Sequence, residues 1–184
     1  FALEWRRTPE PLAMERTEQA LRRVGLAPFA DAPWDSLSGG QRQLAAAAAA
    51  IACDSPLLVF DEATSMLDER NRAELLSSAR ALNRSGAAVV WVTQRLDELL
   101  PDDRTIAMAD GRLAFDGVAR AFLYGSAGRP SPCSACGVRL PYMAELAIAL
   151  RAQGALQDPL PVTPEEWSAA LRFDESAEYG GLPA

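Results

Sequence analysis

The sequence predicts an α/β fold with parallel strands, followed by a small helical extension. Two short apolar runs, 57–60 and 88–93, have the length and composition of strands buried in a parallel sheet. Between them, Asp68 is suited to cap a helix that continues to about Asn83, and Gly86 is suited to end it. Strand, helix and strand in this order form a parallel α/β unit.

The residues before the first strand predict helices. Apolar residues recur at roughly helical spacing from Met14 to Val24, and Gly25 ends that pattern. An alanine-rich segment from Ser38 to about Ala52 is a strong helix former that begins with two glycines. We therefore expect a helical region ahead of the sheet.

The residues after the second strand predict a hairpin and then a helix. The hairpin pairs 104–108 with 112–115, and Asp110 and Gly111 between them form a turn dipeptide that tolerates positive φ. Farther along, apolar residues at helical spacing in 141–153 predict an amphipathic helix. These elements extend the chain beyond a single α/β unit.

A change of composition indicates where the core ends. The segment 125–136 is rich in Gly, Ser and Pro and lacks an apolar period, as linkers do. A capping box that begins at Thr163 predicts a last helix. We expect a core of residues 1–124, a linker of 125–136, a helical C-terminal extension of 137–173 and a tail of 174–184.

Charge and composition exclude several classes of function. The 184 residues carry a net charge of −7, which argues against a surface that holds nucleic-acid phosphates. The chain contains no His, which excludes Ser-His-Asp catalysis, an imidazole base and His-ligated metals. It also contains no Lys, so a phosphate-binding loop that ends in G-K-S or G-K-T is absent from this sequence.

The cysteines and the apolar stretches indicate a soluble chain of the cytoplasm. Three cysteines, Cys53, Cys133 and Cys136, suit a reducing compartment better than a disulfide framework. Cys133 and Cys136 could form a redox pair or half of a zinc site, but without His one chain supplies too few zinc ligands, so a site shared across a dimer is the only metal option and we expect free thiols. The apolar stretch 44–52 is far shorter than the ~20 residues that cross a bilayer.

Two features of the sequence suggest phosphate chemistry. Ser38, Gly39 and Gly40 begin a helix, where free backbone amides and the helix dipole favour anions. Asp61 and Glu62 follow a buried strand directly, at the edge where ligands bind in open α/β sheets. Alone, the first could be an ordinary helix cap and the second two solvated acids. Their combination favours a nucleotide role, with one carboxylate near Mg²⁺ and the other orienting water.

These strings resemble the ATP-binding-cassette ATPases, a family of P-loop nucleotide hydrolases. Residues 37–41 (LSGGQ) match the signature loop of that family, 57–62 (LLVFDE) its Walker B strand, and 65–68 (SMLD) its D-loop. The resemblance implies a partial P-loop core with a remnant of the helical subdomain, and ATP with Mg²⁺ as cofactors. It also implies a dimer as the working unit.

The resemblance assigns a role to each matching residue. Glu62 would be the general base, Asp61 would support Mg²⁺ through water, and Gln94 occupies the position of the switch residue. The signature residues would contact ATP held by the opposite subunit; they are Ser38, Gly39, Gly40 and Gln41. Ser65 and Asp68 belong to the D-loop. The switch residue is commonly His in this family, and Gln94 can donate a hydrogen bond but cannot titrate.

The C-terminal part resembles one branch of the family, the energy-coupling-factor ATPases. Residues 138–151 and 160–171 look like the extension through which the two ATPases of that branch associate, although two generic amphipathic helices would give a similar pattern. The resemblance implies uptake of a vitamin or a metal ion. The implied partners are a second ATPase, identical or different, a transmembrane coupling subunit and a substrate-binding membrane subunit. The implied location is the inner face of the cell membrane.

The absence of a phosphate-binding lysine leaves three interpretations. We expect a fragment of an ATPase that does not hydrolyse ATP alone. The first alternative is a natural, hydrolysis-incompetent partner that lends its signature loop to another subunit. The second is a cassette ATPase outside transport, which the acidic composition and the C-terminal resemblance disfavour.

Overall fold

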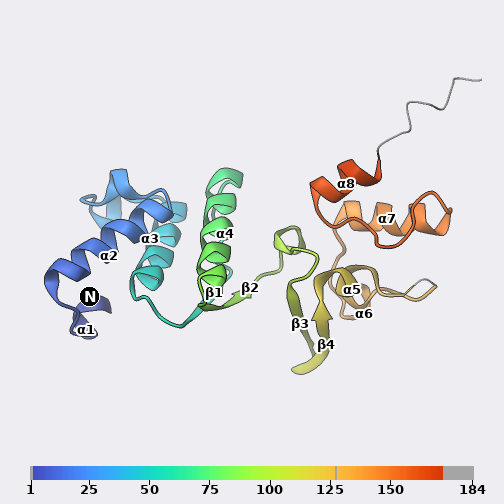
Figure 1. The fold of residues 1–184 in the computed structure, drawn as a ribbon, viewed down its shortest axis with the longest axis horizontal. Helices are drawn as coiled ribbons and strands as arrows, with labels where there is room; N and C mark the ends of the chain where they lie inside the picture. Colours follow the sequence, from blue (N-terminus) through green and yellow to red (C-terminus); the bar gives the residue numbers. More distant parts are fainter. Residues whose placement is uncertain (1, 127, 172–184) are drawn as a thin grey trace, which may run out of the picture. The chain divides into compact units, whose positions relative to one another are not determined.

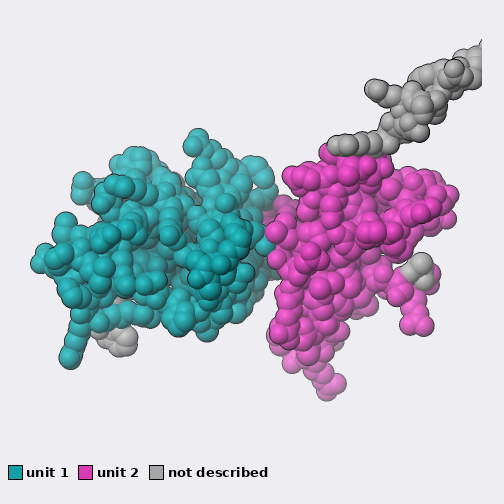
Figure 2. Space-filling model, in the orientation of Figure 1, with its two compact units in different colours: residues 1–94 teal, residues 95–184 magenta. Residues whose placement is uncertain are grey.

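The computed structural model describes residues 2–126 and 128–171, and it divides into two compact units, Phe1–Gln94 and Arg95–Ala184 (Figure 2). Each unit has its own apolar core, so each is described separately. The expected tail of residues 174–184 lies outside the described residues.

The described residues of the first unit form four α-helices and two strands, which Figure 1 shows with their labels. They are α1 (Ala2–Trp5), α2 (Glu10–Arg23), α3 (Gly39–Ala52), β1 (Leu57–Asp61), α4 (Glu69–Arg84) and β2 (Ala88–Val92), with short 3-10 turns η1 (Ala27–Phe29) and η2 (Trp34–Ser36). The predicted helices and strands are confirmed. Helix α2 begins before the predicted Met14 because Pro11 lies in its first turn, where a helix tolerates proline.

Strands β1 and β2 form a parallel pair, as predicted, with Leu57 opposite Ala88 and Asp61 opposite Val92. One face of this sheet is covered: Leu58 and Phe60 are buried in a core shared with α2, α3 and α4. The rings of Phe60 and Trp91 pack with centroids 5.2 Å apart. This core holds the carboxyl ends of both strands at one edge of the sheet.

The other face of the same sheet is apolar and exposed. Leu57 (52%), Val59 (57%), Val90 (47%) and Val92 (46%) keep about half of their surface open to solvent. In the described part of the chain, the expectation of buried strands therefore holds on the helix-side face only. A two-stranded sheet also has two unpaired edges, and exposed apolar strands of this kind promote association.

We expect the isolated chain to self-associate through this face. The double variant Val59→Thr/Val90→Thr should shift the association to higher protein concentration, because it removes apolar surface while keeping a β-branched shape. Light scattering across a concentration series measures the shift. Val89→Thr, on the covered face, is the matched control and should leave association unchanged. A monodisperse wild-type chain at all concentrations would contradict the prediction.

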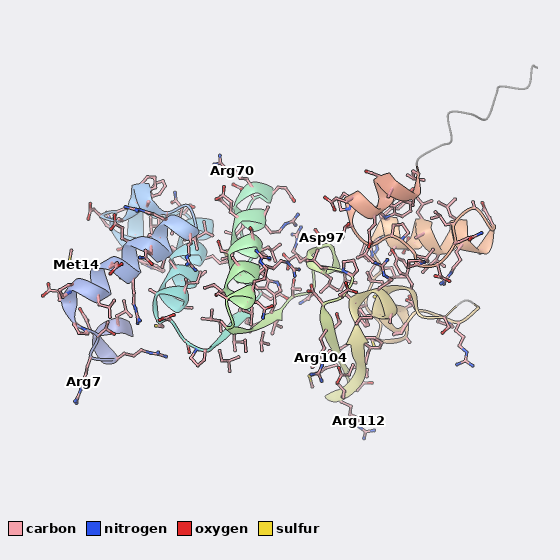
Figure 3. The ribbon with its side chains drawn as sticks, in the orientation of Figure 1. Arg7, Met14, Arg70, Asp97, Arg104 and Arg112 are labelled. Atoms are coloured by element: carbon pink, nitrogen blue, oxygen red, sulfur yellow. The ribbon has the colours of Figure 1, made fainter. Side chains whose placement is uncertain are left out.

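The described residues of the second unit form a short 3-10 turn, a hairpin and four α-helices. They are η3 (Leu96–Glu98), β3 (Arg104–Ala109), β4 (Arg112–Val118), α5 (Ala119–Tyr124), α6 (Pro132–Ala135), α7 (Tyr142–Ala152) and α8 (Pro164–Ala170). The predicted hairpin is confirmed, and its turn residues Asp110 and Gly111 have φ of 52° and 71°. Arg104, labelled in Figure 3, lies on β3. It pairs with Asp116 on β4 through two hydrogen bonds of 2.8 and 2.9 Å, which lower the pKa of the Asp116 carboxyl.

Helices α7 and α8, both predicted, pack on α5 around a core that includes Leu123, Leu160 and Trp167. Arg120 on α5 holds α8 through a 2.5 Å ion pair with Glu166, whose other oxygen accepts the Val162 amide at 2.7 Å. Glu166 also completes the predicted capping box at the start of α8. These contacts fasten the helical extension to α5.

The structure divides the chain into its two units between residues 94 and 95. The composition instead indicates a linker at residues 125–136. The hairpin belongs to the second unit because Phe115 on β4 packs against Phe122 on α5, with centroids 5.2 Å apart. The segment 125–136 lies within that unit and includes the short helix α6. Among the described helices, none has the length and apolar character required to cross a membrane.

Candidate functional site

The signature loop lies at the N-terminus of α3. Ser38 caps the helix: its hydroxyl accepts the Gln41 amide at 3.2 Å, and the Gln41 side chain accepts the Ser38 amide at 2.8 Å. Ser38 and Gly39 are exposed, so an anion has access to the first turn. The Ser38 hydroxyl, although it accepts one bond, retains its own proton to donate.

The two carboxylates lie at the carboxyl edge of the sheet. Asp61 is the exposed last residue of β1, and Glu62 follows it with a φ of 48°, a left-handed conformation that is uncommon for a residue other than glycine. The Glu62 amide donates to Val92 at 2.9 Å, and its carbonyl accepts the Ser65 amide at 3.1 Å. These bonds hold the backbone of Glu62 in this left-handed conformation, which ends the strand. Backbone conformations that are uncommon for the residue type occur often at functional sites.

Gln94 lies at the same sheet edge, two residues after the end of β2, and it is exposed. The hydrogen bond from the Glu62 amide to the Val92 carbonyl joins the end of β1 to the end of β2. The structure thus brings Asp61, Glu62 and Gln94 to one edge. Carboxylates and an amide there provide oxygen ligands for Mg²⁺ and donors and acceptors for water.

The loop that follows Glu62 connects the sheet to α4. Thr64 is buried, Ser65 is exposed, and Met66 is 70% exposed. Asp68 caps α4 by accepting the Asn71 amide at 2.8 Å, as its position in the sequence predicts. The two D-loop residues therefore have structural partners in addition to the roles that their motif implies.

Gln43, on α3, makes contacts that the sequence does not predict. Its amide nitrogen donates to the Glu62 carbonyl at 2.8 Å and to the Ser65 hydroxyl at 3.0 Å, and its oxygen accepts the Met66 amide at 3.0 Å. Helix α3, which begins with the signature loop, is therefore joined directly to the loop that follows the acid pair, Asp61 and Glu62. No pattern in the sequence marks a glutamine one turn inside a helix as a link to a distant loop.

An open groove of about 1290 Å³ lies elsewhere, between α1, α2, η1 and α3. Neither the signature residues nor the acid pair line it. In the described part of the chain, no group of three or more Cys, Asp or Glu side chains could hold a metal ion.

The chain is similar to ATP-binding proteins of ABC transporters. Residues 5–65 match the family described as ABC transporter. The chain is 39% identical over 179 residues to the energy-coupling factor transporter ATP-binding protein EcfA1 of Symbiobacterium thermophilum, covering 97% of the chain and 58% of that protein. It is 36% identical over 156 residues to EcfA1 of Geobacillus kaustophilus, covering 84% of the chain and 54% of that protein.

Solved structures show the same fold. An inward-facing metal-chelate type ABC transporter superposes with a TM-score of 0.52 at 31% identity, over 60% of this chain and 44% of that one. A bacterial Atm1-family ABC exporter with ATP bound superposes with a TM-score of 0.51 at 28% identity, over 57% of this chain and 20% of that one. The chain spans 54–58% of the length of the curated relatives above.

Proposed function

We propose that this chain, which belongs to the ABC transporter ATPase family, supplies the signature loop and the catalytic acid pair of an ATPase that drives uptake across a membrane. The observation that carries the proposal is the 39% identity, over 97% of the chain, to an energy-coupling factor ATP-binding protein. The substrate class that we propose, a vitamin or a metal ion, follows from the same similarity.

Glu62 is the proposed general base, because a carboxylate at this strand edge can take a proton from water as it attacks phosphorus. Asp61 is the proposed support for Mg²⁺ through water. When bound, the metal neutralises charge on the phosphate oxygens. Gln94 orients the water or the phosphate by hydrogen bonding, and its lack of titration makes this contribution independent of pH.

The signature loop is the proposed contact for ATP that another ATPase subunit holds. The exposed first turn of α3 offers backbone amides, and the Ser38 hydroxyl offers one more donor. Gly39, Gly40 and Gln41 complete this surface. Ser65 and Asp68 shape the loop between the two nucleotide-facing parts of the chain.

The proposed assembly contains a second ATPase, a transmembrane coupling subunit and a substrate-binding membrane subunit, with no nucleic acid. We place it on the cytoplasmic face of the membrane. The 184 residues contain no Lys and thus no G-K-S or G-K-T loop, so we propose that they do not hydrolyse ATP alone.

A chimera tests this function. Residues 1–171 of this chain would replace the matching part of the Symbiobacterium thermophilum relative, whose remaining residues stay unchanged. We expect Mg²⁺-dependent ATP turnover and ATP-dependent dimerisation by the chimera, and no saturable ATP binding by the 184-residue chain in calorimetry. The unaltered relative is the positive control. A folded chimera that binds ATP without turning it over would overturn the proposal.

A further inference from the structure

Gln43 makes three hydrogen bonds to three different residues of one loop. Its amide nitrogen donates to the carbonyl of Glu62 and to the hydroxyl of Ser65, while its oxygen accepts the amide of Met66. The side chain is half-buried, and the residues that it reaches are 19 to 23 positions away in the sequence. One side chain therefore fixes the backbone of the acid-pair loop at two points.

The same loop packs directly on the first turn of α3. A Cβ added to Gly40 would lie 2.9 Å from the Met66 carbonyl oxygen, and one added to Gly39 would lie 3.2 Å from the Met66 sulfur. The signature turn and the loop after Glu62 thus contact one another both through Gln43 and through the glycines. A displacement of either one must move the other.

We propose that Gln43 is a positioning residue that couples the signature loop to the catalytic acid pair within one chain. This inference rests on the proposed function, in which the signature loop contacts ATP held by a partner and Glu62 serves ATP held by its own subunit. Gln43 then transmits the state of one ATP site to the other. It touches neither nucleotide and acts by holding the Glu62 backbone against the signature helix.

The chemistry of the side chain explains why this position requires glutamine. The site presents two acceptors and one donor, and a primary amide supplies two donors and one acceptor in a single planar group. Glutamate keeps the acceptor for the Met66 amide but places a carboxylate against the Glu62 carbonyl. Methionine has nearly the same length and loses all three bonds.

The test uses the chimera with Gln43→Met and Gln43→Glu. We expect Gln43→Met to lower kcat about tenfold with the KM for ATP nearly unchanged, and to lower the Hill coefficient for ATP toward about 1. Gln43→Glu should lower kcat and the Hill coefficient in the same direction. Gln153→Met, at an exposed glutamine after α7, is the matched control and should change neither quantity.

Hydrogen exchange separates positioning from a general loss of stability. In Gln43→Met, exchange of the Met66 amide should accelerate about tenfold, whereas Gln43→Glu should keep that amide protected because its acceptor remains. A purely structural role would instead lower the unfolding midpoint and leave the kcat of the folded enzyme and its Hill coefficient unchanged. If Gln43→Met does not fold, Gln43→Glu decides the question.

Three outcomes distinguish this inference from the function on which it rests. If Glu62→Gln stops turnover while both Gln43 variants keep wild-type kcat and Hill coefficient, the coupling role is wrong and the function stands. If turnover survives Glu62→Gln, the assignment of Glu62 as the base is wrong, and if the unmutated chimera binds ATP without turning it over, the proposed function itself is wrong.

Discussion

Replacement of Glu62 by Gln in the chimera is expected to lower ATP turnover by at least about a hundredfold, the usual contribution of a general base. ATP-dependent dimerisation should persist, because an amide of the same shape leaves the strand edge and the signature loop in place. A phosphate-release assay measures turnover, and size-exclusion chromatography with and without ATP measures association. The combination of lost turnover and retained association identifies Glu62 with the chemical step.

The structure gives a reason to expect that this variant folds. The left-handed backbone of Glu62 is held by main-chain bonds to Val92 and Ser65 and by Gln43, none of which involves its carboxylate. Glu15→Gln, at an exposed position on α2, is the control for loss of a charge and should turn over normally. Turnover by Glu62→Gln at the wild-type rate would contradict the assignment of the base.

The sequence predicted those features that depend on local chemistry. Asp68 and Thr163 cap helices as expected, and Ser38 caps α3 as the ordinary-cap alternative allows, because a side-chain oxygen at a helix start satisfies an amide that has no other partner. The Asp110 and Gly111 turn follows from the tolerance of these residues for positive φ. The family, the α/β fold and the parallel pairing are confirmed as well.

Features that depend on packing across the chain could not be predicted in the same way. The apolar runs of β1 and β2 indicate burial on two faces, but exposure is decided by which elements cover each face, and here one face is open. Helix α5 is only six residues long and is stabilised mainly by the core that it shares with α7 and α8. Gln43 was missed because its partners are about 20 residues away.

Gly40→Ala is expected to destabilise the first unit by about 2–3 kcal/mol. Its Cβ would lie 2.9 Å from the Met66 carbonyl oxygen, and the backbone there cannot yield without moving the loop. Overpacking of this kind costs about 1–3 kcal/mol, and each Gln43 bond lost with the loop costs about 1 kcal/mol more. Alanine recovers at most about 1 kcal/mol through its helix propensity. Urea unfolding of dilute chain measures the difference.

Gly39→Ala is the matched comparison, because its Cβ would meet only the Met66 sulfur, at 3.2 Å. That atom ends a flexible side chain that is 70% exposed, so it can move aside and the substitution should cost less than about 1 kcal/mol. Met66→Ala separates the two cases: it should remove the remaining cost at Gly39 and leave the cost at Gly40. Equal losses in both glycine variants would show that the loop backbone does not press on the signature turn, and the link between that turn and the loop after Glu62 would then rest on Gln43 alone.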